Sequence, residues 1–387
     1  MAVNLYIVRH AEAEGNLYRR AHGRYDGLLT ATGKRQLKAL AARFEGITID
    51  AAYSSDLIRA RMTGEAVLKA RGIPVIPKRE FSEIGLGVWE DRPWGEIIYK
   101  DWEQYKLFES DTERWSVEGC EPALEAGLRF YNAVIDVASR HEGQTVAIFA
   151  HGSVIRMFLK LVYSASPGAK CKEAGYCDNT AVTHIVYDGG RLTVQYEYDS
   201  SHLGELSTIE RHKHLPIEQR YNANTRYRPL DLNKERDIFL GFISDSWLGV
   251  YGSFKGFDTD EYLSKAIKAA ETDPDCLALV LLKDEIAGLV QLDPKSGEEE
   301  KSGNISLLYM REKFRGMSLG IQPVGYAVSY FRKRGCDFVT LTVSEKNKRA
   351  LGFYEYYGFE RVGIKSGVNS RLYTMRLDIS RPKSLST

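Results

Sequence analysis

The sequence has few cysteines and no long hydrophobic run, and each shortage excludes a class of protein. Its five cysteines are an odd number without paired close spacing, so neither a complete disulfide framework nor a zinc site is expected. The longest apolar run, Cys276–Leu282, falls far short of the roughly 20 residues of a membrane-spanning helix. No basic segment precedes a long apolar core at the N-terminus. We therefore expect a cytoplasmic protein that binds neither a metal nor a membrane.

Neither half of the 387-residue chain has an excess of one charge. Residues 1–203 contain 25 basic and 27 acidic side chains, which leaves 28 of the 53 basic and 25 of the 52 acidic side chains for residues 204–387. A nucleic-acid binder carries a concentrated basic field, so no nucleic-acid partner is expected. The balance favours small-molecule chemistry. The length exceeds that of an ordinary single core and predicts two domains.

The pattern of the sequence changes once along the chain. A polar segment with little apolar periodicity, residues 204–225, predicts a linker between domains at 1–203 and 226–387. In the first domain, apolar runs such as Thr145–Ala150 alternate with helical spacing such as Ala123–Arg140. This alternation is typical of a parallel sheet covered by helices. In the second, two helical segments precede several short strands, which predicts another α/β unit.

Two histidines stand where predicted strands end. His10 follows the first strand and His151 follows a later one, and ligands of open α/β sheets gather at the carboxyl ends of strands. With Arg9 and Arg59, they would form a compact cationic pocket for phosphate. An imidazole there can attack phosphorus while guanidinium groups neutralise the charge of the transferred group. Glu83 is then the candidate acid for the departing alkoxide.

Four segments, RHAEAEGN, SSDLIRARMTGE, SEIGLGVWED and FAHGSVIR, resemble the four consecutive motifs of the histidine phosphatase (phosphoglycerate-mutase-like) superfamily. The resemblance covers residues 1–203 and implies a three-layer α/β/α fold. It also implies that His10 is a phosphohistidine nucleophile and that Glu83 is the proton donor. The residues implied to bind the phosphoryl group are Arg9, Asn16, Arg59 and His151. Ala11 and Ala13 replace the commoner Gly and Ser or Thr, which removes one hydroxyl contact to phosphate.

Within this family the choice lies between a phosphatase and a mutase. The segment between Glu83 and His151 lacks the basic, tyrosine-containing insertion of typical mutases and resembles the broad phosphatase branch. Hydrolysis of a small phosphate ester is therefore predicted, with phosphoglycerate-mutase-type phosphotransfer as the alternative. A rival of another class is a noncatalytic domain that senses a phosphorylated metabolite. Such a sensor would not need the acid Glu83.

The second domain contains a loop, Arg311–Gly320, between a strand and a helix, and its second half includes the small residues Gly316, Ser318 and Gly320. Its backbone N–H groups could face a pyrophosphate. Together with NKRALGFYEYYGFE, this loop resembles motifs A and B of the GNAT N-acetyltransferase superfamily over residues 226–377. The resemblance implies a mixed-sheet fold, acetyl-CoA as the cosubstrate and an amine as the acceptor. The residues implied to bind acetyl-CoA are Arg315, Gly316, Ser318, Gly320 and Asn347, with Ser318 in place of the middle glycine.

In GNAT enzymes, a tyrosine of the last helix protonates the leaving thiolate, and Tyr354 matches that position. A base is often found on the strand before the loop, but ISLLYM contains no carboxylate. The base is left open between a water chain and a residue of the first helices. The two resemblances predict a bifunctional enzyme, a metal-independent phosphatase joined to an N-acetyltransferase, whose substrates and oligomeric state are not predicted.

Overall fold

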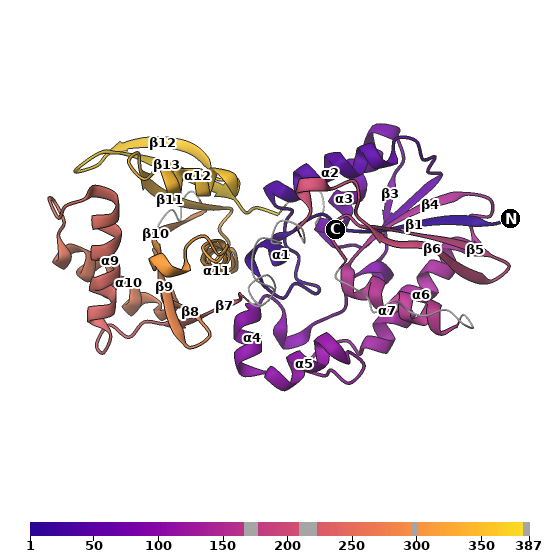
Figure 1. The fold of residues 1–387 in the computed structure, drawn as a ribbon, viewed down its shortest axis with the longest axis horizontal. Coiled ribbons are helices and arrows are strands. Elements are labelled where there is room, and N and C mark those ends of the chain that lie inside the picture. The colour runs from indigo at the N-terminus through magenta and orange to yellow at the C-terminus, as the bar shows by residue number, and fades with distance from the viewer. Residues whose placement is uncertain (166–176, 209–222, 294, 296–300, 382–387) are drawn as a thin grey trace. The chain divides into compact units, whose positions relative to one another are not determined.

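A computed structural model describes residues 1–165, 177–208, 223–293, 295 and 301–381, which fold into two compact units (Figure 1). The first unit comprises Met1–Asn16, Arg20–Arg92 and Lys100–Arg220, and the second comprises Leu17–Arg19, Pro93–Tyr99 and Tyr221–Thr387. The predicted linker at 204–225 lies largely outside the described residues. None of the described helices is long and apolar enough to cross a membrane.

The first unit contains a six-stranded sheet with the order β3-β2-β4-β1-β5-β6. The strands are β1 (Val3–Arg9), β2 (Ala51–Ser54), β3 (Val75–Pro77), β4 (Thr145–Ala150), β5 (Val182–Asp188) and β6 (Arg191–Asp199). The first four pair in parallel, as predicted. Strands β5 and β6 extend this parallel sheet with an antiparallel edge, which the apolar pattern of the sequence does not indicate. Gly189 and Gly190 have φ values of 54° and 84°, and such left-handed residues allow a tight hairpin.

Helices cover both faces of this sheet and produce the three layers that the sequence predicts (Figure 1). The covering helices are α2 (Ala31–Phe44), α3 (Ile58–Leu68), α6 (Ala123–Ser139) and α7 (Gly152–Ser164). Because side chains alternate along a strand, Ile7 belongs to the core under α6 and α7, and Val8 belongs to the core under α2 and α3. The hydroxyl of Thr30 accepts a hydrogen bond from the Gly33 N–H and so caps α2.

The other elements of this half of the chain are short. The α-helices are α1 (Glu14–Tyr18), α4 (Trp94–Lys100) and α5 (Trp102–Ser110). The 3₁₀ turns are η1 (Lys69–Arg71), η2 (Arg79–Phe81), η3 (Gly87–Trp89) and η4 (Gly204–Leu206). Turn η2 ends two residues before Glu83, so its placement helps to determine where the candidate acid lies.

The second unit contains a seven-stranded mixed sheet with the order β12-β13-β11-β10-β9-β8-β7. Its strands are β7 (Thr225–Pro229), β8 (Leu277–Leu282), β9 (Glu285–Asp293), β10 (Ser302–Met310), β11 (Phe338–Ser344), β12 (Glu360–Ser366) and β13 (Arg371–Asp378). Among these described strands, only β10 and β11 pair in parallel. Their pairing stops at Ile305 and Leu341, although both strands continue, so the two strands separate toward their carboxyl ends.

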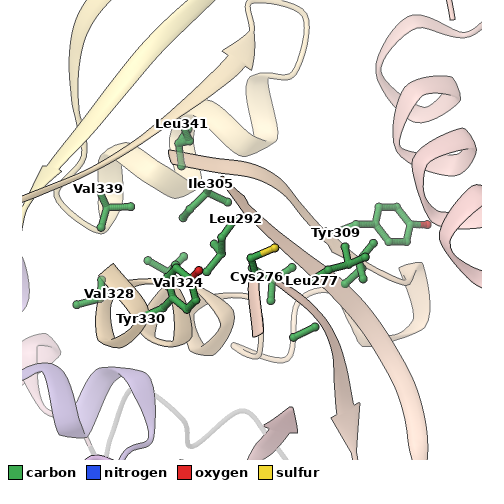
Figure 2. Packing of buried hydrophobic residues seen from close by; sticks show 14 of the residues in the cluster. Cys276, Leu277, Leu292, Ile305, Tyr309, Val324, Val328, Tyr330, Val339 and Leu341 are labelled. Atoms are coloured by element: carbon green, nitrogen blue, oxygen red, sulfur yellow. The ribbon is translucent and has the colours of Figure 1, made fainter. Parts of the chain in front are cut away.

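Four helices pack with this sheet around one apolar core, part of which is drawn in Figure 2. They are α9 (Arg236–Tyr251), α10 (Thr259–Thr272), α11 (Ile321–Lys333) and α12 (Lys348–Tyr356). The 3₁₀ turns are η6 (Pro274–Cys276) and η7 (Glu312–Phe314). Asp258 caps α10 by accepting hydrogen bonds from Asp260 N–H and Glu261 N–H. The core joins Phe242 of α9 with Val324 of α11, which fixes these helices relative to the sheet.

Candidate active sites

The first site lies at the carboxyl ends of the adjacent parallel strands β1 and β4. His10 directly follows β1 and His151 directly follows β4, and their ring centroids are 5.2 Å apart. The side chains are 6% and 0% exposed. Both ring nitrogens of His151 are buried and have no hydrogen-bond partner among the residues that the structure describes. Since buried polar atoms normally find a partner, a ligand is expected to supply one here.

A backbone contact orients the imidazole of His10. Its Nδ1 lies 2.7 Å from the carbonyl oxygen of Ala11, so Nδ1 carries the proton and Nε2 has a free lone pair. Burial and the charges of Arg59 and Arg9 hold the pKa of His10 well below its usual range. Burial, followed by Arg59, His10 and Arg9, lowers the pKa of His151 in the same way. His10 is therefore neutral and can act as a nucleophile.

Two arginines, the buried Arg59 and the partly buried Arg9, lie beside these histidines. The Arg59 side chain is 1% exposed and donates hydrogen bonds to the carbonyl oxygens of Tyr25 (2.9 Å), Gly23 (2.7 Å) and His22 (3.2 Å). These bonds fix its position without neutralising its charge. Arg9 donates from Nη1 to the carbonyl oxygen of Cys177, and its buried Nε has no partner in the described part of the chain. The pocket is therefore cationic and offers donors to an anion such as a phosphoryl group.

Asn16 approaches the same pocket with a fixed orientation. Its Oδ1 accepts hydrogen bonds from the Ala13 N–H (3.1 Å) and from Nδ2 of Asn179 (3.2 Å). Asn179 also donates to the carbonyl oxygen of His10, at 3.1 Å. The oxygen of Asn16 is thus engaged, which leaves its amide nitrogen as the end that can donate to phosphate. Asn179 was not among the predicted residues.

Glu83 is held at the start of helix α7, beside His151. Its Oε1 accepts from the Val154 N–H (2.9 Å) and the Ile84 N–H (3.0 Å), and its Oε2 accepts from the Ser153 N–H (3.1 Å). The carboxylate therefore occupies the first amides of the helix, and the phosphoryl group is left to the histidines and arginines. The structure brings all the predicted residues of the phosphatase site to this end of the sheet.

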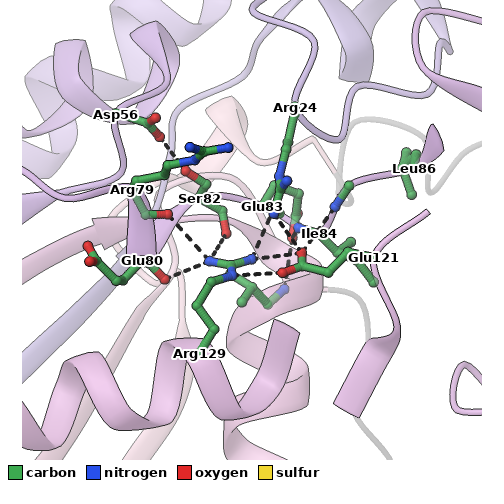
Figure 3. Close-up of polar contacts among 12 residues, drawn as sticks. Arg24, Asp56, Arg79, Glu80, Ser82, Glu83, Ile84, Leu86, Glu121 and Arg129 are labelled. Carbon is green, nitrogen blue, oxygen red and sulfur yellow. Dashed lines mark hydrogen bonds and ion pairs between the residues drawn. The ribbon is translucent and has the colours of Figure 1, made fainter. Parts of the chain in front are cut away.

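Sequence reasoning missed Arg129, which positions Glu83 (Figure 3). From helix α6, Arg129 donates hydrogen bonds to the backbone carbonyls of Glu80 (2.7 Å), Ser82 (3.1 Å) and Glu83 (3.5 Å). It also forms an ion pair with Glu121, with an Nε–Oε1 distance of 2.8 Å. Burial acts to raise the pKa of Glu121, but the hydrogen bond and charge of Arg129, together with the charge of Arg24, outweigh it and lower that pKa. This guanidinium clamps the backbone that carries the candidate acid.

Removing this clamp is expected to displace the acid without removing it. In Arg129→Gln, hydrolysis of alkyl phosphates should slow by up to about 10²-fold, because a misplacement of about 1 Å can cost that much. Aryl phosphates, whose leaving groups need little protonation, should be affected much less. Arg140→Gln is the matched control, because Arg140 lies at the C-terminal end of helix α6, which also carries Arg129, and its side chain is 66% exposed. Equal losses for alkyl and aryl phosphates would contradict a positioning role.

A second buried ionic cluster, also missed, surrounds His22. Its Nε2 lies 3.5 Å from Oδ1 of Asp91, to which Arg20 donates from Nε at 2.8 Å. Burial lowers the pKa of His22, while Asp91 acts in the opposite direction. Because the carbonyl of His22 accepts from Arg59, this cluster supports one arginine of the pocket. Asp91 lies 71 residues from Arg20, and no pattern in the sequence links them.

The depressed pKa values predict how stability depends on pH. Below about pH 6.5, unfolded histidines bind protons that buried His10 and His151 do not bind. The free energy of unfolding should therefore fall as the pH drops from about 6.5 toward the lower pKa values that the two histidines have in the folded protein. Above about pH 6.5, the stabilisation from the two neutral histidines is fully present. Calorimetry between pH 7 and pH 5 should show a falling midpoint for the first unit. The fall should be shallower in His151→Asn, and identical slopes would contradict the assignment.

The second site is built around the separation of β10 and β11. The loop after β10 contains two residues in the left-handed region, Gly316 (φ 80°) and Ser318 (φ 56°). A serine at positive φ is uncommon, so the backbone keeps the shape of a glycine loop at some cost in strain. The exposed Arg315 donates from Nε to the Met310 carbonyl at 2.8 Å. Gly320 directly precedes α11, whose first amides follow the loop.

The remaining predicted residues lie on α12. Oδ1 of Asn347 accepts from the Ala350 N–H at 3.1 Å, so this side chain caps the helix. Tyr354 is buried, and its ring packs against Phe353 and Phe359 with centroid distances of 5.2 Å in both cases. Burial raises the pKa of Tyr354. The phenol therefore stays protonated near neutral pH, as a proton donor requires.

Comparison with known proteins identifies both parts of the chain. The family model of the histidine phosphatase superfamily (branch 1) matches residues 5–200, about half of the chain. The model of the acetyltransferase (GNAT) family matches residues 243–359. The chain therefore belongs to the histidine phosphatase superfamily and also carries a GNAT acetyltransferase domain, as the motifs predict.

Individual relatives match the first part of the chain. Phosphoserine phosphatase 1 of Hydrogenobacter thermophilus is 29% identical over 213 residues, which cover 54% of this chain and 99% of the relative. Phosphoglycerate mutase-like protein 4 of Arabidopsis thaliana is 30% identical over 210 residues, which cover 53% and 89%. Among solved structures, Bacillus stearothermophilus YhfR has 32% identity and a TM-score of 0.49, covering 52% of this chain and 99% of that structure.

Proposed function

We propose that the chain is a bifunctional enzyme that hydrolyses phosphomonoesters at the first site and acetylates an amine at the second. The observation that carries the first activity is the pocket of His10, His151, Arg9, Arg59 and Glu83, in which every residue except Arg9 is buried. A nucleophile, anion-binding arginines and an acid meet there. The domains proposed for the two activities are 1–203 and 226–387, with acetyl-CoA as the cosubstrate of the second.

In the first reaction, Nε2 of His10 attacks phosphorus in line with the ester oxygen. The N–P bond forms, the P–O bond breaks, and Glu83 gives a proton to the departing alkoxide. Arg9 and Arg59 neutralise the charge on the transferred group. Water then attacks the phosphohistidine, with Glu83 accepting its proton, and phosphate leaves with His10 restored. Every step uses a side chain of the pocket and none requires a metal.

Hydrolysis is favoured over mutase-type transfer by the phosphatase-like segment after Glu83 and by the similarity to a phosphoserine phosphatase. The mutase alternative draws on the similarity to a phosphoglycerate mutase-like protein. Incubation with p-nitrophenyl phosphate, O-phosphoserine and 3-phosphoglycerate distinguishes the phosphatase from the mutase, because a phosphatase releases free phosphate and a mutase releases an isomeric ester. A chain that binds these esters without turning them over would instead be a sensor.

In the second reaction, the amine nitrogen attacks the thioester of acetyl-CoA. Beyond Ile305 and Leu341, the backbone N–H groups of β10 and β11 do not pair between the two strands, and a backbone N–H there can polarise the thioester carbonyl. The N–C bond forms, the C–S bond breaks, and the thiolate receives a proton from Tyr354. Release of free CoA thiol from acetyl-CoA in the presence of amines tests this activity independently of phosphate release.

Tyr354→Phe is expected to slow thiol release by on the order of 10², because general acid catalysis is lost while the ring packing remains. Affinity for acetyl-CoA, measured by calorimetry, should not change. Tyr356→Phe serves as the control, since Tyr356 lies on the same helix and is 47% exposed. Unchanged turnover in Tyr354→Phe would remove this residue from the reaction.

A further inference from the structure

The proposed acetyl transfer needs a group that removes a proton from the acceptor, because primary alkylamines are protonated at neutral pH. The sequence of β10, SGNISLLYM, contains no carboxylate. Helix α9, however, crosses the carboxyl end of this strand and brings an acidic side chain to it. That side chain is Asp245, which is exposed and forms no ion pair with any residue that the structure describes.

Asp245 is tied to β10 by Tyr309. The phenol of Tyr309 donates a hydrogen bond to Oδ2 of Asp245 at 3.3 Å. One turn earlier on α9, the ring of Phe242 packs on the Tyr309 ring with a centroid distance of 5.3 Å. In Figure 2, the hydroxyl of Tyr309 points away from the labelled core residues and toward a neighbouring helix. These two contacts hold α9 in one orientation on the strand.

The same contacts place Asp245 at the separation of β10 and β11. Tyr309 lies beyond Ile305, where the pairing of the two strands has ended. At the end of α9, the ring of Tyr251 lies 5.8 Å from Nζ of Lys346, which follows β11. Helix α9 therefore extends from the end of one strand to the end of the other. Its exposed carboxylate lies along this path.

We propose that Asp245, oriented by Tyr309, receives the ammonium group of the acceptor and takes its proton. This inference rests on the proposed acetyl transfer and assigns the acceptor to primary amines that are cationic at neutral pH. The proton passes from the ammonium nitrogen to the carboxylate, and the freed lone pair forms the N–C bond as the C–S bond breaks. The thiolate takes its proton from Tyr354. The nitrogen then loses its second proton, which passes through solvent to Tyr354 and restores the phenol. Asp245 returns its own proton to water.

The test compares amines that need deprotonation with one that does not. Thiol release is measured at pH 7.5 with 2-phenylethylamine and propylamine, which are protonated, and with methoxyamine, which is neutral. Asp245→Asn should lower kcat/KM by on the order of 10² for the first two and by only a few-fold for methoxyamine. Tyr309→Phe, which keeps the ring but loses the orienting bond, should show the same pattern to a smaller degree.

Asp237→Asn is the matched control, because Asp237 is an exposed carboxylate in the first turn of the same helix. Its rates should equal those of the unchanged protein. Equal losses for all three amines in Asp245→Asn, or no loss, would overturn the role of Asp245 while acetyl transfer stands. Absence of thiol release by the unchanged protein with all three amines would overturn the proposed acetyl transfer itself, and this inference with it.

Discussion

Replacing His10 by alanine is expected to abolish phosphate release, with a loss in kcat on the order of 10⁴–10⁶. The reason is structural: Nε2 of His10 is the nucleophilic atom left free when Nδ1 binds the Ala11 carbonyl. His151 cannot replace it, because it lies at the end of the neighbouring strand and its ring is 5.2 Å away, centroid to centroid. Initial rates with p-nitrophenyl phosphate measure the loss.

Two further measurements make this result specific. The unchanged protein, quenched during turnover, should carry a phosphoryl group that is lost in acid, and His10→Ala should carry none. His141→Gln is the matched control, since His141 bonds to Tyr53 and Gln144 outside the pocket. Acetyl-CoA binding should be the same in all three proteins. Hydrolysis by His10→Ala at the rate of the unchanged protein would show that the nucleophile has been assigned wrongly.

The second large effect is expected for Glu83→Gln, which removes the proton donor but nearly keeps its shape. Loss of general acid help should slow alkyl phosphates by on the order of 10²–10⁴. Nitrophenyl phosphate should be slowed far less, because its leaving group departs without a proton. The measurement is kcat/KM for a series of phosphate esters whose leaving-group acidity varies. The slope of rate against leaving-group pKa should steepen in the variant.

The contacts of Glu83 require a check on this variant. Both carboxylate oxygens accept backbone hydrogen bonds, and an amide NH₂ in place of one oxygen would face a backbone donor. Glu83→Gln should therefore also lower the unfolding midpoint, and Glu83→Asp separates this effect from the chemistry because it keeps the acid. A loss of equal size for every ester would indicate a structural role and would exclude Glu83 as the acid.

The first sheet shows which parts of the fold a sequence can reveal. Strands β1 and β4 are buried on both faces, so their apolar runs predict them. Strands β5 and β6 flank Gly189 and Gly190. Two adjacent glycines between segments of alternating apolar and polar residues predict a hairpin, and this was the signal that the sequence offered. The terminal strand β12 is exposed along its whole length, so no apolar periodicity marks it.

The residues of the candidate sites likewise fall into those that a local sequence pattern indicates and those that it does not. His10 and Glu83 lie in segments with a local pattern, so sequence reasoning could name them. Arg129 acts on carbonyl oxygens 46 to 50 residues away, and a helix sequence does not show which arginine faces such a target. Asp245 meets Tyr309 only because α9 crosses a strand 64 residues further along the chain. Contacts of this kind depend on packing, which local patterns do not encode.

The amides that bind Glu83 belong to the first turn of α7, where the peptide dipoles of a helix sum to a partial positive charge. When Glu83 passes its proton to the leaving alkoxide, a full negative charge forms at that end of the helix. The charge is thus created where an oriented field already favours it. Helix α7 therefore acts as a fixed electrostatic partner of the acid, and no side chain has to move to neutralise the product of the step.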